Sequence, residues 1–220
     1  MSTLTTSYLD IVERLPAGAQ LRLQNIPWDE YEHLLSQMGT LPGRRVSYDR
    51  GRLVIMSPSL EHEEYKDTIY TLIRFLADEL SVNMETRGQA TFKSKLLKKG
   101  AEPDACFYVQ NAARIIGQRT IELGKDPPPD VVVEIDTTNE SLDKFHIYAA
   151  LGVPEIWRYD GEQAFFYQLV GEEYQVMDNS LAFASLAATD LARFVERSKT
   201  EGQTAALAAF REEVRARLRP

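Results

Sequence analysis

Two short stretches near the middle of the chain, residues 101–109 and 131–136, are apolar with acids at intervals that suit β-strands. Because successive residues of a strand point to opposite faces, each stretch presents two distinct faces. On the first strand, Asp104 falls on a largely apolar face, and on the second, Glu134 lies on the same face as Val132. The pattern therefore predicts two strands that each carry one acid toward the interior.

These two acids need a compensating partner if they are buried. Moving an ionised carboxylate into the interior costs several kcal/mol unless a cation or good hydrogen bonds compensate. A hard divalent ion held by one or two carboxylates and water would serve, and Mg²⁺ fits that description best. Repulsion between the acids would then mean that removing either one leaves the fold intact or more stable. The alternative is that Asp104 and Glu134 lie at strand ends, where they are solvated or ion-paired.

A helix is predicted directly after the second strand. Thr137 and Glu140 have the spacing of a capping box, in which each side chain bonds the backbone of the other. The helix should therefore begin just after Asp136 and continue to Leu151, with Gly152 as its C-terminal stop.

This predicted helix carries a lysine, Lys144, on the same face as Tyr148 and Leu151. One interpretation is an ordinary pair between Glu140 and Lys144, one helical turn apart. The other is that the ammonium group reaches over the start of the helix toward Glu134. There it could orient an attacking water or stabilise a pentavalent phosphate. The spacing alone leaves both interpretations open.

A second helix is predicted over residues 60–80, where apolar side chains recur every three or four residues. His62 shares the apolar face with Ile69 and Ile73, and Glu61 lies at the edge of that face. A single histidine on such a face is either a satisfied core residue or a contributor to a site.

The remaining pattern predicts a single domain. Residues 44–58 are typical of two strands about a turn, residues 87–95 of one strand, and residues 164–177 of a hairpin. The C-terminal residues have a helical composition, and they could wrap the core or mediate self-association. We divide the domain into a helical lead-in (1–44), a core (45–180) and a C-terminal helical tail (181–220).

Composition narrows the class of protein. A chain of 220 residues that is 44% hydrophobic can bury one substantial core. Residues 1–15 lack the basic start and apolar stretch of a signal peptide. No run approaches the roughly 18 apolar residues of a membrane span, so we expect a cytoplasmic protein with no membrane partner. The single cysteine, Cys106, excludes an intramolecular disulfide.

The net charge of -8 is unfavourable for binding nucleic acid, because contacts with phosphates supply most of that affinity. One local exception lies in residues 91–100, which contain no acid but include Lys93, Lys95, Lys98 and Lys99. These lysines are either a solvated hairpin tip or a surface that contacts the substrate backbone, with Lys93, Lys95 and Lys98 as the candidates.

Four segments together resemble a known group of enzymes. They are PD at residues 103–104, EID at 134–136, DKFHIYAALGVPEIWRYDG at 143–161 and RLVIMSPSLEHEEY at 52–65. This set is similar to the PD-(D/E)xK nuclease superfamily. It resembles more closely the Uma-type restriction endonuclease family, which is abundant in cyanobacteria and some other bacteria.

The resemblance implies an α/β restriction-endonuclease-like fold, with a small mixed β-sheet flanked by helices and a C-terminal helical tail. It implies hydrolysis of DNA phosphodiester bonds with a divalent metal ion, magnesium or manganese. It also implies a homodimer, since restriction-type nucleases often cut both strands as dimers.

The site residues follow by the same resemblance. Asp104 matches the first acid of the motif and Glu134 the second, and both would hold the metal ion. The lysine that usually stands two residues after the second acid is replaced by Asp136, and Lys144 takes its role from the following helix. His62 or, as a further metal ligand, Glu61 would complete the site, and we place His62 first.

Two other functions stay open. The chain could be a catalytically degenerate nuclease fold that serves as a binding or interaction module, which Asp136 and the acidic charge favour. It could also be a metal-dependent hydrolase that acts on a phosphate ester other than nucleic acid.

Overall fold

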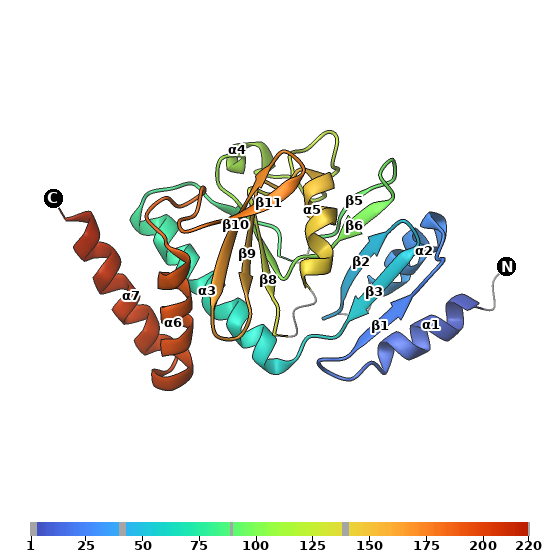
Figure 1. Cartoon of the computed structure of the whole chain (residues 1–220), viewed down its shortest axis with the longest axis horizontal. Coiled ribbons are helices and arrows are strands. Elements are labelled where there is room, and N and C mark those ends of the chain that lie inside the picture. The colour runs from blue at the N-terminus through green and yellow to red at the C-terminus, as the bar shows by residue number, and fades with distance from the viewer. Residues whose placement is uncertain (1–3, 40–42, 89, 138–140, 220) are drawn as a thin grey trace.

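The strands form two sheets that lie side by side (Figure 1). The computed structural model describes residues 4–39, 43–88, 90–137 and 141–219. The five-stranded sheet has the order β1-β3-β2-β6-β5, and all its pairs are antiparallel. Its strands are β1 (Gln20–Leu23), β2 (Arg45–Asp49), β3 (Arg52–Met56), β5 (Phe92–Ser94) and β6 (Lys99–Ala101).

The six-stranded sheet is mixed and has the order β11-β10-β9-β8-β7-β4. Its strands are β4 (Glu85–Thr86), β7 (Ala105–Tyr108), β8 (Val131–Ile135), β9 (Glu155–Tyr159), β10 (Ala164–Val170) and β11 (Glu173–Met177). The pair β8–β9 is parallel and the other pairs are antiparallel. A parallel pair needs a crossover connection, and the helix α5 (Phe145–Leu151) lies in the segment that joins these two strands.

Helices cover both faces of the six-stranded sheet. α3 (Leu60–Glu79), α6 (Ala188–Glu201) and α7 (Gln203–Leu218) share one hydrophobic core with it. α5 lies on the opposite face and packs against strands of both sheets. α1 (Leu4–Glu13) and α2 (Trp28–Met38) cover the five-stranded sheet, and α4 (Ala112–Ile115) follows β7. No helix in the described part of the chain is long and apolar enough to span a bilayer.

The alternation predicted for the second acidic strand is confirmed. In β8, Val131 and Val133 pack into the core formed with α3, whereas Val132 packs into the core formed with α5. Glu134 has the same parity as Val132, so its side chain lies on the α5 side of the sheet. The predicted helix of residues 60–80 is confirmed as α3, and residues 44–58 form the predicted pair β2 and β3.

Two stretches that were each predicted as one strand are divided between two strands in the structure. The first acidic stretch is divided between β6 and β7, which belong to different sheets. Pro103 lies between them and cannot donate a backbone hydrogen bond, which interrupts strand pairing there. Residues 87–95 likewise hold no continuous strand, since β4 and β5 lie on either side of a break and in different sheets. The expected single sheet is therefore two.

The helix predicted to begin after Asp136 begins later. A short 3₁₀-helix (Ser141–Lys144) precedes α5, which starts at Phe145 and ends at Leu151. Gly152 follows it in the left-handed conformation (φ 79°). The predicted stop at Gly152 is thus confirmed, and Glu140 of the predicted capping box lies outside the described residues.

Both ends of the chain contribute to hydrophobic cores, the N-terminal part to that of the five-stranded sheet and the C-terminal helices to that of the six-stranded sheet. The lead-in contains a strand, β1, that the sequence pattern did not indicate and that pairs with β3. Phe194 of α6 and Phe210 of α7 are buried against the six-stranded sheet, so the C-terminal helices wrap the core. The limits assigned to the lead-in, core and tail stay predictions.

Candidate active site

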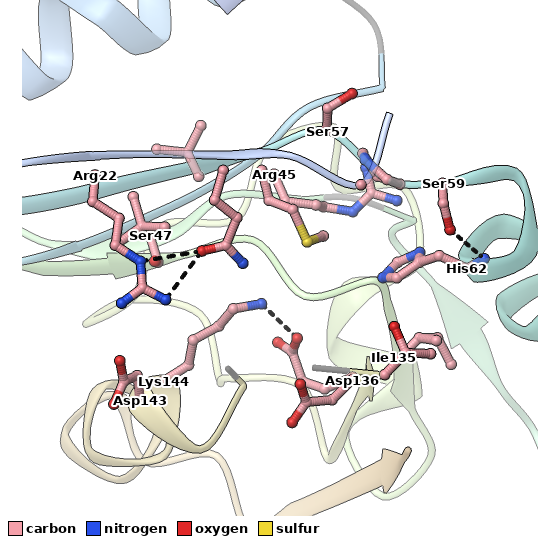
Figure 2. Close-up of a pocket in the computed structure, with 18 of the residues that line it drawn as sticks. Arg22, Arg45, Ser47, Ser57, Ser59, His62, Ile135, Asp136, Asp143 and Lys144 are labelled. Carbon is pink, nitrogen blue, oxygen red and sulfur yellow. Dashed lines mark hydrogen bonds and ion pairs between the residues drawn. The ribbon is translucent and has the colours of Figure 1, made fainter. Parts of the chain in front are cut away.

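A cavity of about 100 Å³ opens between the polar face of the five-stranded sheet and the end of β8 (Figure 2). β1, β2 and β3 supply one wall, and β8 with the 3₁₀-helix supplies the other. The charged residues that line it are Arg22, Arg45, Arg52, Lys144, Glu134, Asp136 and Asp143. Three arginines of the five-stranded sheet therefore face three acids and a lysine on the opposite wall of the cavity.

Asp104 is fixed at the junction of β7 and β8. Its backbone N–H donates to the carbonyl of Val133 (3.1 Å), and its Oδ2 accepts from the backbone N–H of Ile135 (2.8 Å). The residue is 1% exposed. The bend after Pro103 thus holds the carboxylate of Asp104 against the end of β8. Asp104 stands one residue before the start of β7.

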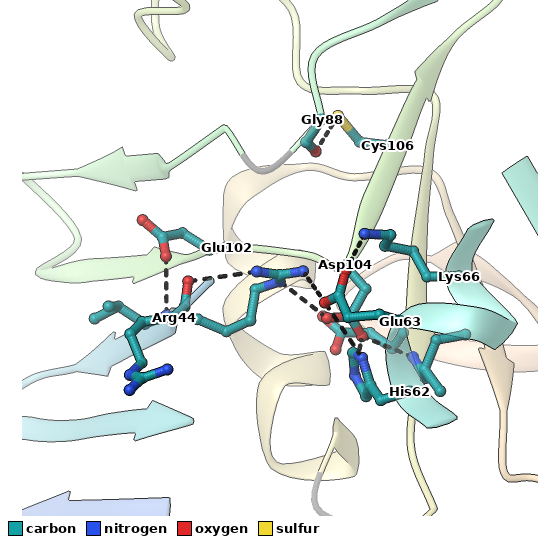
Figure 3. A network of polar contacts seen from close by, with 12 residues as sticks. Arg44, His62, Glu63, Lys66, Gly88, Glu102, Asp104 and Cys106 are labelled. Atoms are coloured by element: carbon teal, nitrogen blue, oxygen red, sulfur yellow. Dashed lines mark hydrogen bonds and ion pairs between the residues drawn. The ribbon is translucent and has the colours of Figure 1, made fainter. Parts of the chain in front are cut away.

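Two side chains contact this carboxylate, and Figure 3 shows His62 beside it. Arg45 Nε lies 3.1 Å from Oδ1 of Asp104, and His62 Nε2 lies 3.1 Å from Oδ2. Burial raises the pKa of Asp104, but His62, Lys144 and Arg45 outweigh that effect and lower the pKa to about 2. Asp104 is therefore ionised at neutral pH.

Arg45 is a site residue that the sequence reasoning missed. It also contacts Glu63 of α3, with Nη2 3.0 Å from Oε1, so one buried guanidinium joins β2, β7 and α3. A signal was present in the sequence. Val46 and Tyr48 of β2 face the core under α2, so alternation places Arg45 and Ser47 on the other face, which lines the cavity.

Glu134 lies near the end of β8, and each of its two carboxylate oxygens has one partner. Lys144 Nζ lies 2.5 Å from its Oε2, and the hydroxyl of Tyr148 donates to its Oε1. Burial raises the pKa of Glu134 to about 7, with Lys144 opposing the rise and Asp104 adding to it. Of the two acids, Glu134 is therefore the one that gains or loses its proton near neutral pH, whereas Asp104 stays ionised.

Lys144 is the last residue of the 3₁₀-helix and stands immediately before α5. Burial lowers its pKa, but the charges of Glu134 and Asp104 outweigh that effect and raise it, so the ammonium is kept. The structure shows the contact with Glu134 that the functional interpretation required. Tyr148, which we expected only as a core residue, is a second partner of the same carboxylate.

The position that usually holds the motif lysine is occupied by a buried ion pair. Asp136 Oδ2 lies 2.7 Å from Nε of Arg158 on β9, and both side chains are nearly sealed from solvent. Burial lowers the pKa of Arg158, but Asp136 outweighs that effect and raises it. Asp136 therefore has a buried ion-pair partner on β9.

His62, rather than Glu61, lies beside the carboxylates. The side chain of Ser59 caps α3 by accepting from the backbone N–H of His62, which fixes the first turn. His62 is 5% exposed and lines the cavity, and its Nδ1 has no hydrogen-bond partner in the described part of the chain. Glu61 is exposed and accepts from the hydroxyl of Tyr65 (2.5 Å), so the structure does not bring it to Asp104.

The basic patch lies on the five-stranded sheet and outside the cavity lining. Lys93 Nζ is 2.9 Å from Glu32, and Lys95 Nζ is 3.5 Å from Asp29, both on α2. Lys98 is exposed at the tip of the β5–β6 hairpin. Contact of these lysines with a substrate stays a prediction.

The donor set for a metal ion is small. Across residues 4–39, 43–88, 90–137 and 141–219, no group of three or more His, Cys, Asp and Glu side chains is arranged to hold an ion. Asp104 and Glu134 supply two carboxylates at the end of β8. Glu134 and Ile135 line the cavity, and the backbone N–H of Ile135 donates to Asp104 behind them.

The two sheets, the flanking helices and the acidic centre define a mixed α/β protein with a nuclease fold. The chain belongs to the Uma2 family, described as "Putative restriction endonuclease", whose profile matches residues 28–195. The resemblance found in the sequence is confirmed. A crystal structure at 1.96 Å of a "putative nuclease belonging to DUF820" from Anabaena variabilis ATCC 29413 superposes with a TM-score of 0.52. It is 17% identical, and the match covers 77% of this chain and 99% of that one, which shows a shared fold. No curated protein matches the chain.

Proposed function

We propose that the chain is a divalent-metal-dependent endonuclease that hydrolyses DNA phosphodiester bonds. The observation that carries this proposal is the contact between Lys144 Nζ and Glu134 Oε2 (2.5 Å), beside Asp104 and within an arginine-lined cavity. Membership of a nuclease family supports the same chemistry. Two acids and a lysine are the residues this chemistry needs, and here they come from three different elements.

The carboxylates fit a hard divalent ion such as Mg²⁺ or Mn²⁺. Such an ion is commonly bound by one or two carboxylates with water completing its shell, and Asp104 and Glu134 provide oxygen donors of that kind. Each carboxylate has about four lone-pair sites. Asp104 contacts Ile135, Arg45 and His62, and Glu134 contacts Lys144 and Tyr148, so both retain sites for a cation. When bound, the ion would supply an activated water and neutralise charge on the phosphate.

The residues of this chain have separable roles in the proposal. Lys144 holds a positive charge next to Glu134, where it can orient the attacking water and stabilise charge that develops on the phosphate oxygens. His62 lies beside Asp104 and lines the cavity, so it can donate a proton or position a phosphate oxygen. Arg22 and Arg52 line the opposite wall, where a strand backbone would pass.

The alternative is a nuclease fold that binds partners without catalysis. It is favoured by Arg45, which already compensates Asp104, and by the Asp136–Arg158 pair at the usual lysine position. A degenerate site should not bind magnesium or manganese at millimolar concentration, so metal affinity separates the two proposals. A hydrolase for other phosphate esters would be exposed by a panel of substrates.

The testing experiment is cleavage of supercoiled plasmid and of single-stranded DNA with magnesium, manganese or chelator. The native chain is compared with Asp104→Asn and Lys144→Ala, and Lys125→Ala serves as a control because Lys125 pairs with Glu122 on an exposed loop. We expect metal-dependent nicking that both site variants lose and the control keeps. Absence of cleavage on any DNA, together with no metal binding, would favour the interaction module.

We further propose that the enzyme acts in the cytoplasm as a homodimer. The support is chemical, because cutting both strands of a duplex calls for two active sites. Light scattering of the purified protein, with and without a duplex, measures the assembly directly.

A further inference from the structure

The turn between β5 and β6 carries two exposed leucines. Leu96 is 92% exposed and Leu97 follows it at the tip, with Lys95 and Lys98 on either side. The turn is closed by the N–H of Lys98, which donates to the carbonyl of Lys95 (3.2 Å). Figure 1 shows this hairpin projecting beside α5. It therefore presents an apolar tip framed by two cations.

Folding alone does not explain this choice of residues. Turns favour Gly, Asn, Asp, Pro and Ser because of their backbone freedom and polar side chains. The β9–β10 and β10–β11 turns follow that rule with Gly161 and Gly171, both at positive φ, whereas the β2–β3 turn combines Gly51 with Arg50 in the left-handed region (φ 45°). The β5–β6 turn instead places Lys98 in the left-handed region (φ 49°) and exposes leucine. The left-handed conformation of Lys98 costs stability, the exposed leucines add none by burial, and each gives the tip a side chain that could meet a ligand.

The cations at the tip suit a polyanion. The chain as a whole carries a net charge of -8, yet residues 91–100 contain no acid. Within the described part of the chain, no acid forms an ion pair with Lys98. Arg50, in the neighbouring turn, is exposed and its backbone N–H donates to the carbonyl of Lys98 (2.9 Å). Lys95, Lys98 and Arg50 thus form a small basic surface around the leucines.

This basic surface lies close to one end of the cavity. Lys99 Nζ lies 2.9 Å from Asp49, which also contacts His146 of α5 (2.8 Å). Arg52, two residues after Arg50, lines the cavity and pairs with Asp143. The hairpin tip therefore lies near the Arg52 end of the cavity, whereas Arg45 and His62 line its other end. A bound strand that followed β2 and β3 could contact both the tip and the site.

We propose that Leu96 and Leu97 form an apolar wedge that enters a groove of DNA and partly unstacks one base step. Lys95, Lys98 and Arg50 then hold the flanking phosphates. Apolar side chains that enter the minor groove are a recurrent means of kinking DNA, and the lysines supply the salt-dependent part of the affinity. Unstacking would free one strand to reach a cavity of only about 100 Å³. The inference rests on the proposed action on DNA.

The test measures binding in the presence of chelator, so that it does not depend on cleavage. The probe is a short duplex that carries a fluorescent end label and a 2-aminopurine at a flexible TA step, where unstacking is least costly. Titrations compare the native chain with the Leu96→Ser/Leu97→Ser double variant. Val176→Ser is the matched control, because Val176 is 67% exposed on β11.

We expect the double variant to bind roughly tenfold or more weakly, as the loss of about one buried leucine would cause. It should also lose the rise in 2-aminopurine fluorescence, while Val176→Ser keeps both. A Lys95→Ala/Lys98→Ala variant should retain the rise in fluorescence but show a shallower dependence of affinity on salt.

Several outcomes would overturn the wedge. One is a double variant with native affinity for DNA, or a native chain that binds without any 2-aminopurine response. Another is binding to anionic phospholipid vesicles, lost in the double variant while DNA binding is kept, which would assign the tip to a membrane surface. A plasmid assay separates the two proposals. Cleavage by a chain that gives no 2-aminopurine response would support the nuclease and contradict the wedge. A 2-aminopurine response without cleavage under any metal would support the wedge and contradict the nuclease.

Discussion

The Nε of Arg45 lies 3.1 Å from Oδ1 of Asp104, and neither side chain is more than 1% exposed. An arginine so deeply buried keeps its charge, because the guanidinium cannot be deprotonated in a protein. Asp104 is therefore a structural counterion as well as a candidate metal ligand. We expected from the repulsion between the acids that removing Asp104 would leave the fold unchanged or more stable. Because Asp104 also compensates the charge of Arg45, we now predict that its removal lowers stability.

Removal of Asp104 should destabilise the protein. Asp104→Ala leaves Arg45 with Glu63 as its remaining carboxylate partner, and breaking a buried pair by removing one member costs about 3–5 kcal/mol. Asp104→Asn should cost less, because its carbonyl can still accept from Arg45 or from the N–H of Ile135. Urea unfolding at neutral pH measures both. Asp29→Ala, which removes an exposed acid, is the control and should change stability by less than about 0.5 kcal/mol.

The same contact predicts how stability depends on pH. The pKa of Asp104 is lowered from 3.8 to about 2, so its contribution is present above about pH 4 and is lost as the pH falls toward 2. The difference in unfolding free energy between the native chain and Asp104→Asn should therefore be constant from neutral pH to about pH 4 and then shrink. Urea titrations at a series of pH values test this, and a difference that persists at pH 2 would contradict it.

Glu134 should make metal binding depend on pH near neutrality. Burial raises its pKa to about 7, and a carboxylate must be ionised to ligate a cation. At pH 6 only about a tenth of the molecules would carry the charge, so Mn²⁺ affinity should rise roughly tenfold between pH 6 and 8 and then level off. Isothermal titration in two buffers of different ionisation enthalpy would detect the released proton. An affinity that does not change with pH would remove Glu134 from the ligand set.

The sequence predicted the features of this site that depend on local spacing. Alternation along residues 131–136 placed Glu134 opposite Val133, and helical spacing put His62 on the core face of α3. The contact between Lys144 and Glu134 was one of two open interpretations. Each of these depends on side-chain direction within one element, which the period of that element determines.

The remaining features depend on pairing between distant segments. Arg45 meets Asp104 across 59 positions of sequence, and no periodicity within β2 indicates which carboxylate its side chain will reach. The single stretch around Asp104 became two strands because the two sheets meet there, and that junction is a property of the tertiary fold. α5 likewise starts at Phe145, after a 3₁₀-helix, whereas the local pattern predicted a start just after Asp136.

Lys144 should matter for catalysis more than for binding. Its ammonium lies 2.5 Å from Glu134 on a half-buried side chain that lines the cavity, so it can act on charge that develops in the transition state. Lys144→Ala should lower the rate of plasmid nicking at saturating DNA by about 100- to 1000-fold. Lys144→Arg, which keeps the charge but not the geometry, should recover part of the rate. Equal loss in Lys125→Ala, or full activity in Lys144→Ala, would contradict the assignment.

Returning a lysine to position 136 should not rescue Lys144→Ala. Asp136 is the buried partner of Arg158, with Oδ2 and Nε 2.7 Å apart, so Asp136→Lys would set two cations against each other in the interior. We expect the combined Lys144→Ala/Asp136→Lys chain to stay inactive and to lose about 3–5 kcal/mol of stability in urea. Adding Arg158→Glu restores a pair of opposite charges and should recover part of that stability. Restored nicking with unchanged stability in the combined chain would contradict this prediction. It would show that a lysine at position 136 can act in the site despite the neighbouring Arg158.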